Sequence, residues 1–302
     1  MTKFSFLQYS FLIFSGMAGA AFGMSFFASR AAKNRARFFT LIFFMTALFV
    51  IYIFVVEPNW IQVTQLKVHD SQLAASLDGV KIIHITDLHL TRGIGFREKQ
   101  LIKKVNELKP DIIFITGDFF DNTDQIEPTK ELIKNLRARI GIWGVPGNTD
   151  HISMSAADIV RALEPGGIRI LVNQSQTVYT KVGKRFWLIG ADEPVYHHDQ
   201  LLEALYGVPR DEPRLLLVHS PDIFDQAVKE EVNLMLVGHT HGGQIGIPFL
   251  VELSEYANRT IYMKGLFKKG KTQMYVNRGI GTKTLPIRFL CRPEIAVIQV
   301  SV

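Results

Sequence analysis

Apolar and polar positions divide the chain into an uncharged beginning and a patterned remainder. Residues 4–29 contain no charged side chain, and neither do residues 38–56. Each run reaches the roughly 20 residues that an α-helix needs to cross a bilayer. Neither run has a polar face at helical spacing, which a helix on the surface of a soluble domain would show. The pattern therefore predicts two consecutive transmembrane helices, over residues 4–29 and 38–56.

Beyond residue 78, short apolar runs alternate with amphipathic patterns. The amphipathic patterns predict helices near residues 97–108 and 129–137. The apolar runs predict strands over residues 80–86, 111–116, 140–145, 185–190, 214–218 and 233–237, and the tail at 274–302 alternates like late antiparallel strands. This alternation is typical of an α/β domain built around sheets. We predict a membrane anchor over residues 1–60, a linker over 61–78 and a globular domain over 79–302.

The segment between the two uncharged runs is basic. It carries four cations and no acid: Arg30, Lys33, Arg35 and Arg37. Short loops rich in Lys and Arg stay on the cytoplasmic side of a membrane. We therefore expect a multi-pass protein of the bacterial inner (cell) membrane with an extracytoplasmic domain and with Pro58 and Trp60 at the exit interface. A signal peptide cleaved near Ala18-Gly19-Ala20 is the weaker alternative, because cleavage would leave the basic loop outside.

Net charge adds little support for a polyanionic partner. The formal charge is +6, and five positive charges precede residue 38 without any acid, which leaves +1 for the rest of the chain. The basic balance therefore indicates contact between the anchor and anionic lipid headgroups. We expect the membrane, and no nucleic acid, as a partner. The single cysteine, Cys291, excludes an internal disulfide.

Residue types that bind metals follow five of the predicted strands. They stand in Asp87-Leu88-His89, Gly117-Asp118-Phe119-Phe120-Asp121, Gly147-Asn148-Thr149-Asp150, His219 and Gly238-His239-Thr240-His241. Sites in α/β domains assemble at the ends of strands. Seven oxygen and nitrogen donors without a thiolate suit Mn, Fe, Zn or Mg, and their number implies two divalent ions that share one ligand. We expect the glycines before Asp118, Asn148 and His239 to turn the backbone sharply out of each strand.

The ordered motifs D-x-H, G-D-x-x-D, G-N-x-D, H and G-H-x-H closely resemble those of the calcineurin-like metallophosphoesterases, over residues 79–302. Within that family, the tail segments 277–281 and 291–294 look like the membrane-associated YaeI- and YkuE-type phosphodiesterase branch. The resemblance implies a four-layer α/β/β/α sandwich, in which two sheets pack face to face with helices outside. In this chain the sandwich would follow the two-helix transmembrane hairpin.

The resemblance also divides the seven metal ligands between two ions, with Asp118 bridging them and Asp121 behind them. The first ion would be held by Asp87, His89 and His241. The second ion would be held by Asn148, His219 and His239. Two divalent ions, with manganese favoured, would bind a hydroxide that attacks phosphorus in line and would neutralise the phosphoryl oxygens.

One position departs from the family pattern. Most members have a histidine after the asparagine of the third motif, where it protonates the leaving oxygen, whereas this chain has Thr149. One interpretation is that His151 supplies the proton, with Asp150 orienting it. The other is that no acid is needed, because a phosphate leaving group is a weak base. The predicted catalytic residues are Asp118, Asn148, Asp150 and His151, and Arg278 is a candidate for phosphate contact.

Three functions are consistent with these motifs. The first is a membrane-anchored, dinuclear-metal phosphoesterase acting on phosphodiester or pyrophosphate bonds, lipid-linked substrates included. The second is a UDP-2,3-diacylglucosamine pyrophosphatase of lipid A synthesis, which conflicts with the predicted topology because that reaction is cytoplasmic. The third is a non-catalytic membrane-tethered scaffold, motivated by Thr149. The complete ligand set favours a metal-dependent phosphoric ester hydrolase, because a scaffold has no need of seven metal-binding side chains.

Overall fold

The computed structural model describes residues 30–180, 183–247 and 260–302. The chain separates into two compact units, Met1–Ile53 and Phe54–Val302. Helix α2 (Arg30–Ile51) continues along the chain as a π-helix (Tyr52–Val56) and a 3-10 helix (Glu57–Asn59). The helix predicted over residues 4–29 lies outside the described residues, and so does the hairpin that it would complete.

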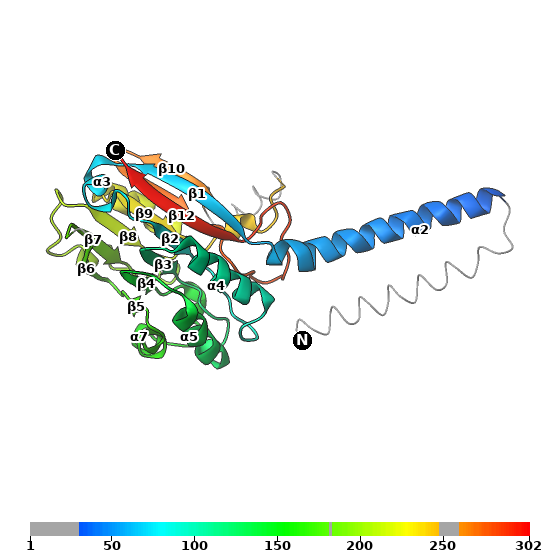
Figure 1. The fold of residues 1–302 in the computed structure, drawn as a ribbon, viewed down its shortest axis with the longest axis horizontal. Helices are drawn as coiled ribbons and strands as arrows, with labels where there is room; N and C mark the ends of the chain where they lie inside the picture. Colours follow the sequence, from blue (N-terminus) through cyan, green and yellow to red (C-terminus); the bar gives the residue numbers. More distant parts are fainter. Residues whose placement is uncertain (1–29, 181–182, 248–259) are drawn as a thin grey trace. The chain divides into compact units, whose positions relative to one another are not determined.

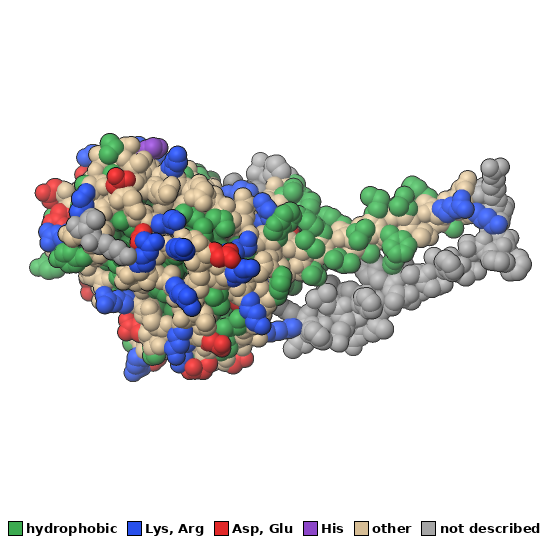
Figure 2. All heavy atoms as spheres, viewed as in Figure 1, with side chains coloured by type: hydrophobic (Ala, Val, Ile, Leu, Met, Phe, Trp, Pro, Cys, Tyr) green, Lys and Arg blue, Asp and Glu red, His purple; other side chains and the backbone are tan. Residues whose placement is uncertain are grey.

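The apolar helix at residues 38–56 is present as predicted. Within the described residues, Ala32–Asn59 is the one helical stretch long and apolar enough to cross a membrane. Hydrophobic side chains gather along α2, and Lys and Arg side chains stand at its beginning (Figure 2). Phe39 and Leu48 are each 65% exposed. Such a row of exposed large apolar side chains is typical of a surface that contacts lipid or another protein.

Two six-stranded mixed sheets form the second unit. The first sheet has the order β1-β12-β2-β3-β4-β5, and the second has the order β10-β11-β9-β8-β7-β6. The first consists of β1 (Gln62–His69), β12 (Glu294–Ser301), β2 (Ile82–Ile85), β3 (Ile112–Thr116), β4 (Gly141–Val145) and β5 (Arg169–Ile170). The second consists of β10 (Gly265–Lys269), β11 (Thr272–Val276), β9 (Leu234–Val237), β8 (Arg214–Leu217), β7 (Arg185–Gly190) and β6 (Gln174–Tyr179).

The central strands of both sheets run parallel. In the first sheet β2, β3, β4 and β5 are parallel neighbours, and in the second β7, β8, β9 and β11 are. Parallel neighbours present their carboxyl ends at the same edge of a sheet. The loops after β2, β3, β4, β8 and β9 therefore start from two such edges, and these loops carry the predicted metal ligands.

Three buried clusters connect the layers of this unit. Between the sheets, Phe114 of the first sheet packs in one cluster with Phe186 and Leu236 of the second. A second cluster joins the first sheet to Leu101 and Leu132 of the overlying helices, and a third covers the other face of the second sheet. The helices on the two outer faces are α4 (Phe96–Leu108), α5 (Ile126–Asn135), α7 (Ala156–Leu163), α8 (Leu201–Ala204) and α9 (Phe224–Lys229). The unit is thus a mixed α/β fold with two sheets between helices (Figure 1).

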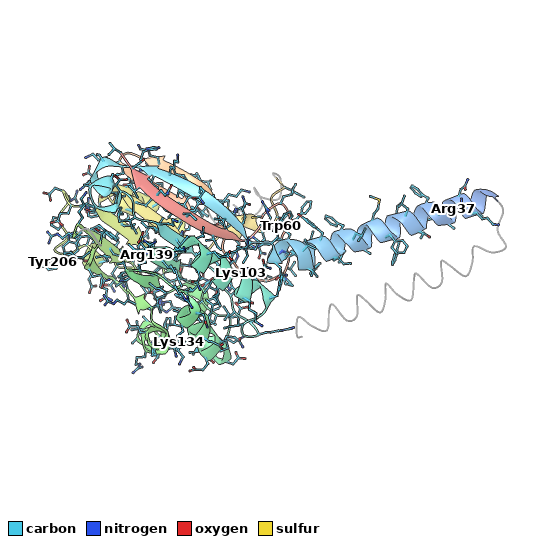
Figure 3. The ribbon with its side chains drawn as sticks, viewed as in Figure 1. Arg37, Trp60, Lys103, Lys134, Arg139 and Tyr206 are labelled. Carbon is cyan, nitrogen blue, oxygen red and sulfur yellow. The ribbon has the colours of Figure 1, made fainter. Side chains whose placement is uncertain are left out.

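Amphipathic spacing explains why the helices cover the sheets. Leu132 and Ile133 on α5 are buried, whereas Lys134 is exposed. On α4, Leu101 is buried and Lys103 is exposed. Figure 3 labels Lys103 and Lys134 on their helices. One stripe of each helix therefore faces the core, and the charged stripe faces water.

The interpretation of residues 61–78 as a linker is wrong. This segment contains β1 and helix α3 (Ser71–Leu77), and β1 pairs in parallel with β12 along its whole length, from Gln62 opposite Glu294 to His69 opposite Ser301. Asp70 caps α3 by accepting a hydrogen bond from the Leu73 N–H at 2.8 Å. The segment was misread because the strand that β1 needs as a partner lies at the opposite end of the sequence.

The tail is only partly antiparallel. As predicted, β12 runs antiparallel to β2, and β10 runs antiparallel to β11. However, β12 also pairs in parallel with β1, and β11 pairs in parallel with β9. Both parallel pairings join segments that are distant in sequence, so no local pattern could have predicted them.

Candidate metal centre

The seven predicted ligands lie together at the ends of five strands. Two of them follow β2, three follow β3, β4 and β8, and two follow β9. All seven are buried: Asp87, His89, Asp118, Asn148, His219, His239 and His241. We call this set the metal centre. Polar groups buried this close together require hydrogen-bond, charge or metal partners, because burying a polar group without a partner destabilises the folded state.

The first predicted ligand group is compact. His89 Nε2 lies 3.1 Å from His241 Nε2 and 3.3 Å from Asp118 Oδ2. His241 Nε2 lies 3.2 Å from Asp87 Oδ1. Ligands about 2.0–2.2 Å from one zinc-sized ion are themselves separated by roughly 3–3.5 Å. The spacing of these four atoms is therefore what a shared divalent ion requires.

The second predicted group has the same spacing and shares an atom with the first. His239 Nδ1 lies 2.9 Å from Asn148 Oδ1 and 3.3 Å from His219 Nε2. His219 Nε2 lies 3.4 Å from Asp118 Oδ2. One oxygen of Asp118 thus reaches both groups, as expected for a bridging ligand. The division of the seven ligands between two ions, which the family resemblance implies, stays a prediction.

Neighbouring acceptors orient two of the imidazoles. His89 Nδ1 lies 2.7 Å from Asp121 Oδ1, and His219 Nδ1 lies 2.7 Å from the Thr116 carbonyl oxygen. Each contact places the donating N–H on Nδ1 and leaves the Nε2 lone pair directed at the group. Such partners fix the tautomer and the ring orientation of metal-binding histidines. The expectation that Asp121 stands behind the ligands agrees with this contact.

An unpaired oxygen tests whether a cation fits the metal centre. Asp87 Oδ1 is buried and has no hydrogen-bond partner among the described residues, although Asp87 Oδ2 accepts the His239 backbone N–H at 3.1 Å. A buried carboxylate oxygen without a donor is unfavourable unless a cation approaches it. Its neighbour at 3.2 Å, His241 Nε2, is itself a ligand atom. The donor set therefore fits a divalent ion between these two atoms.

Electrostatics in the metal centre also favour cations. Burial raises the carboxyl pKa of Asp118, but the neighbouring His219 and His89 hold that pKa well below its ordinary value. Burial lowers the pKa of His219, yet the Asp118 carboxylate outweighs it and raises this pKa to about 10. Burial lowers the pKa of His241 to about 4. The Asp118 carboxylate thus favours positive charge beside it; His241 is neutral, and a divalent ion that bound here would displace the proton on His219.

The backbone of the metal centre is strained where the ligands stand. Asp87, Asp118 and His239 have φ angles of 52°, 52° and 69°, and His89 and His241 have φ angles of 43° and 52°. Residues other than glycine rarely adopt positive φ, and they do so mainly where surrounding structure enforces it. The ligands themselves therefore make the sharp turns out of the strands.

The predicted reason for the glycines is only partly right. Gly117 has a φ of 77°, as a turning glycine should. Gly147 has a φ of −116°, and Gly238 is not among the residues with positive φ. At both positions a side chain would collide: a Cβ on Gly147 would lie 2.3 Å from Asp118 N, and one on Gly238 would lie 2.1 Å from Thr86 Oγ1. These two glycines permit close approach of neighbouring loops rather than a turn.

Thr149 holds the carboxylate of Asp118. Its backbone N–H donates to Asp118 Oδ1 at 2.8 Å, and its hydroxyl donates to Asp118 Oδ2 at 2.9 Å. A hydroxyl that donates to a carboxylate has no second proton for a leaving group. Residue 149 therefore positions Asp118 in this chain.

The prediction that Asp150 orients a proton donor is wrong. Asp150 Oδ1 accepts the Phe119 N–H at 2.9 Å, and Asp150 Oδ2 accepts the Gly147 N–H at 2.9 Å. Burial, followed by the Asp118 charge, raises the pKa of this carboxyl to about 7. Asp150 thus ties the loop after β4 to the loop after β3. Among the described residues, no hydrogen bond joins it to His151.

His151 contacts residues outside the seven predicted ligands. Its Nε2 lies 2.7 Å from Asp192 Oδ1, and its ring meets that of His198 edge-on, with centroids 4.7 Å apart. Asp192 follows β7, and neither Asp192 nor a role for His198 was predicted. Its position in the sequence could have indicated Asp192 as a site residue, because Asp192 follows the end of β7 just as Asp87 and Asp118 follow the ends of β2 and β3.

Residues 278–291 of the C-terminal segment support the metal centre through contacts with the backbone of Asp87. Gly281 N–H donates to the Asp87 carbonyl at 2.6 Å. A Cβ on Gly279 would lie 2.7 Å from Asp87 Cβ, so only glycine allows this approach. The buried Arg288 guanidinium donates to the carbonyl oxygens of Gly281, Cys291 and Arg278, at 2.6, 3.0 and 2.8 Å. Sequence reasoning missed Arg288, because an arginine at no recognised motif position is ordinarily read as a surface residue.

The hypothesis that Arg278 contacts phosphate stays a prediction, and the structure pairs this residue with Glu294. Its Nε lies 3.1 Å from Glu294 Oε2, and its backbone N–H donates to the same oxygen at 3.1 Å. Glu294 therefore fixes the orientation of this guanidinium. The cation at the mouth of the site is Lys283, which lines a pocket of about 230 Å³ together with His239 and His241. The rest of the lining includes Ile245, Leu285 and Ile287.

Comparisons with known proteins agree with this geometry. Residues 80–243 match the calcineurin-like phosphoesterase family. The uncharacterized metallophosphoesterase YkuE of Bacillus subtilis is 33% identical over 81% of this chain and 87% of its own length. Phosphodiesterase YaeI of Escherichia coli is 29% identical over 82% of this chain and 91% of its own length. A zebrafish transmembrane protein with a metallophosphoesterase domain is 27% identical over 88% of this chain and 63% of its own length.

Proposed function

The chain belongs to the calcineurin-like phosphoesterase family of metal-dependent hydrolases, and on that premise we propose that it is a membrane-anchored, dinuclear-metal hydrolase of phosphodiester or pyrophosphate bonds. One observation carries the proposal. Seven buried nitrogen and oxygen donors form two groups that share Asp118 Oδ2, which lies 3.3 Å from His89 Nε2 and 3.4 Å from His219 Nε2. Two divalent ions, with manganese favoured, would occupy these groups.

The chemistry follows from the donors. Bound there, two divalent ions supply positive charge for the phosphoryl oxygens and activate water for attack in line with the leaving group. Asp118 would be the shared ligand, and Thr149 holds both its oxygens in place. Asp121 and the Thr116 carbonyl hold His89 and His219 in the ligating tautomer. The protein's contribution is thus a fixed geometry that needs no rearrangement during the reaction.

The proton for the leaving group would come from His151. We propose this residue because Thr149 donates to Asp118, and because Asp192 holds His151 Nε2 at 2.7 Å. Burial lowers the pKa of His151, but the hydrogen bond that its Nε2–H donates to Asp192 outweighs burial and raises the pKa. A raised pKa keeps a proton available near neutral pH. Leaving groups that are weak bases, such as phosphates, would need no such donor.

Leaving-group dependence tests the role of His151. We expect His151→Gln to slow cleavage of alkyl phosphodiesters by roughly 10²-fold, in the range of general acid catalysis. Cleavage of bis-p-nitrophenyl phosphate, whose leaving group is already a weak base, should change little. Equal loss on both substrates would show that His151 supports the structure rather than the leaving group.

Lipid-linked substrates are part of the proposal. The pocket beside His239 and His241 combines the Lys283 cation with apolar walls from Ile245 and Leu285. A cation beside an apolar wall suits a molecule that joins a phosphate to a hydrocarbon chain. The apolar Ala32–Asn59 helix supports a membrane anchor, and two relatives carry the name transmembrane protein with metallophosphoesterase domain.

The first experiment measures hydrolysis by the full chain, purified in detergent with added manganese. Substrates are bis-p-nitrophenyl phosphate, p-nitrophenyl phosphate and UDP-diacylglucosamine. Asp118→Ala and His239→Ala should abolish activity, while the exposed control His197→Asn should retain it. Turnover of the UDP-lipid with little of either nitrophenyl ester would favour the lipid A pyrophosphatase. Bound metal without any turnover would favour the membrane-tethered scaffold.

Topology needs a separate test. The basic residues 30–37 support an extracytoplasmic domain if the chain crosses the inner membrane twice. We expect an alkaline phosphatase fused to the C-terminus to be active and a cytoplasmic fluorescent reporter to be dark. A bright reporter with an inactive phosphatase would place the domain in the cytoplasm.

A further inference from the structure

A second group of metal-binding side chains lies outside the metal centre. It consists of His151 at the end of α6 (Asn148–His151), Asp192 after β7, and His198 in the loop that follows. We call it the His151 cluster. One ligand atom from each of these residues lies within 4.8 Å of the other two. None of the three belongs to the seven ligands of the metal centre.

The aspartate of the His151 cluster is buried and oriented. The side chain of Asp192 is 5% exposed, and that of His151 is 4% exposed. Asp192 Oδ1 accepts the Glu193 backbone N–H at 2.9 Å while it faces His151 Nε2. A buried carboxylate that faces imidazole nitrogens is the kind of anchor that metal sites use.

The side chain of Asn173 joins the two ends of the loop that carries His198. Asn173 Oδ1 accepts the Asp192 N–H at 2.9 Å and the Gln200 N–H at 2.8 Å, so it joins the two ends of the loop. Asn173 Nδ2 donates to the His198 carbonyl at 2.8 Å. The position of His198 beside Asp192 is therefore built into the fold. Its side chain remains exposed, which leaves it free to adjust.

We propose that the His151 cluster is a third metal site, which binds Zn²⁺ through His151, Asp192 and His198. Two imidazoles and one carboxylate suit zinc, which in open sites takes three protein ligands and one further ligand from solution. Zinc would replace the proton shared between His151 Nε2 and Asp192 Oδ1. The exposed His198 would move by roughly 1 Å to reach the tetrahedral spacing of about 3.4 Å.

Zinc at this site would inhibit the enzyme. This consequence rests on the proposed function: Nε2 of His151 faces Asp192, so the proton for the leaving group would come from Nδ1 of the imidazolium, and an imidazole bound to zinc through Nε2 cannot form that imidazolium. Inhibition should therefore affect alkyl phosphodiesters more than bis-p-nitrophenyl phosphate. The metal centre would remain loaded throughout, because its ligands are separate.

Zinc stoichiometry tests the site directly. The full chain in detergent is stripped with a chelator, dialysed against buffered Zn²⁺ and analysed for zinc per chain. Wild type should bind one ion more than His198→Ala, and Asp192→Asn should match His198→Ala. The control His197→Asn changes the neighbouring exposed histidine, whose φ of 61° asparagine tolerates, and it should match wild type.

The outcomes separate this site from the metal centre. Three zinc ions in wild type and two in His198→Ala support both proposals. A difference of one ion at a lower total would support the third site and contradict the dinuclear centre. Equal zinc content in wild type and His198→Ala would overturn the third site. If the variants differ by one ion but zinc inhibits both equally, the inhibitory role is wrong.

Discussion

The metal centre and the His151 cluster both join histidines to aspartates, but the fold holds them differently. In the metal centre all seven ligands are buried, and five of them have positive φ angles. In the His151 cluster two side chains are buried and His198 is exposed. A site whose ligands are fixed beforehand binds without ordering cost, whereas an adjustable site binds more weakly and reversibly. The comparison suggests a resident metal pair beside an exchangeable ion.

The largest effect should follow from the shared ligand. Asp118→Asn leaves an oxygen in place but removes the negative charge between the two groups. We expect activity on bis-p-nitrophenyl phosphate to fall by roughly a thousandfold or more, with loss of bound manganese. The control variant Asp225→Asn, at an exposed position, should keep both the activity and the bound manganese. Full manganese content with low activity would mean that Asp118 is not the bridge.

The next largest effect concerns Arg288, which donates hydrogen bonds to carbonyl oxygens of the C-terminal segment beside the metal centre. Arg288→Met leaves several buried carbonyls without their donor, so the free energy of unfolding should fall by about 3 kcal/mol or more. The measurement is thermal unfolding in detergent, with the exposed Arg137→Met as control. An unchanged melting temperature would mean that water replaces the guanidinium.

His84 extends the comparison to a buried histidine that binds no metal. Burial lowers its pKa to about 4, whereas the histidine of the unfolded chain has the ordinary pKa of 6.5. As the pH falls from 6.5 to 4, the unfolded state takes up a proton before the folded state does, so stability is lost across that window. The loss should be on the order of 2–3 kcal/mol.

Denaturation at stepped pH measures this loss. His84→Gln should flatten the dependence between pH 6.5 and 4, and the exposed His69→Gln should keep it. The metal-free protein is used, so that release of metal at low pH does not add to the slope. A slope that His84→Gln leaves unchanged would assign the acid sensitivity to other groups.

A smaller effect is expected from the partner of His89. Asp121→Asn weakens the contact at 2.7 Å that sets the His89 tautomer. Manganese affinity should fall by about 10–100-fold, as measured for such partners in general. The matched control is Asp124→Asn, in the same loop. Unchanged affinity would show that packing alone orients the imidazole.

The smallest effect should come from the adjustable site. His198→Ala should leave manganese-supported hydrolysis of bis-p-nitrophenyl phosphate within about twofold of wild type, because this substrate needs no proton from His151, whose ring His198 contacts. It should nevertheless remove one zinc ion. Loss of manganese-supported activity in this variant would mean that the two clusters work as one site, which would end the distinction drawn above.

Short-range patterns of apolar and polar residues were enough to predict several helices and strands and the positions of the candidate ligands. The strand at residues 185–190 and the helix near 97–108 coincide closely with β7 and α4. The seven ligands were predicted because each follows a strand directly, and the ends of parallel strands meet at one edge. Strand β1 was missed, and residues 61–78 were predicted as a linker, for the opposite reason, since β1 is defined by pairing with β12 at the other end of the chain.

The sequence by itself determined the family, the ligand types and the presence of an apolar helix, because these depend on residue identity and short spacing. Only the tertiary structure decided what the unassigned side chains do. Thr149 donates to Asp118, Asp150 ties two loops, Arg278 pairs with Glu294, and Asp192 meets His151. Each of these roles depends on a contact with a residue from another loop or strand. Such contacts form only after the sheets have brought distant segments together.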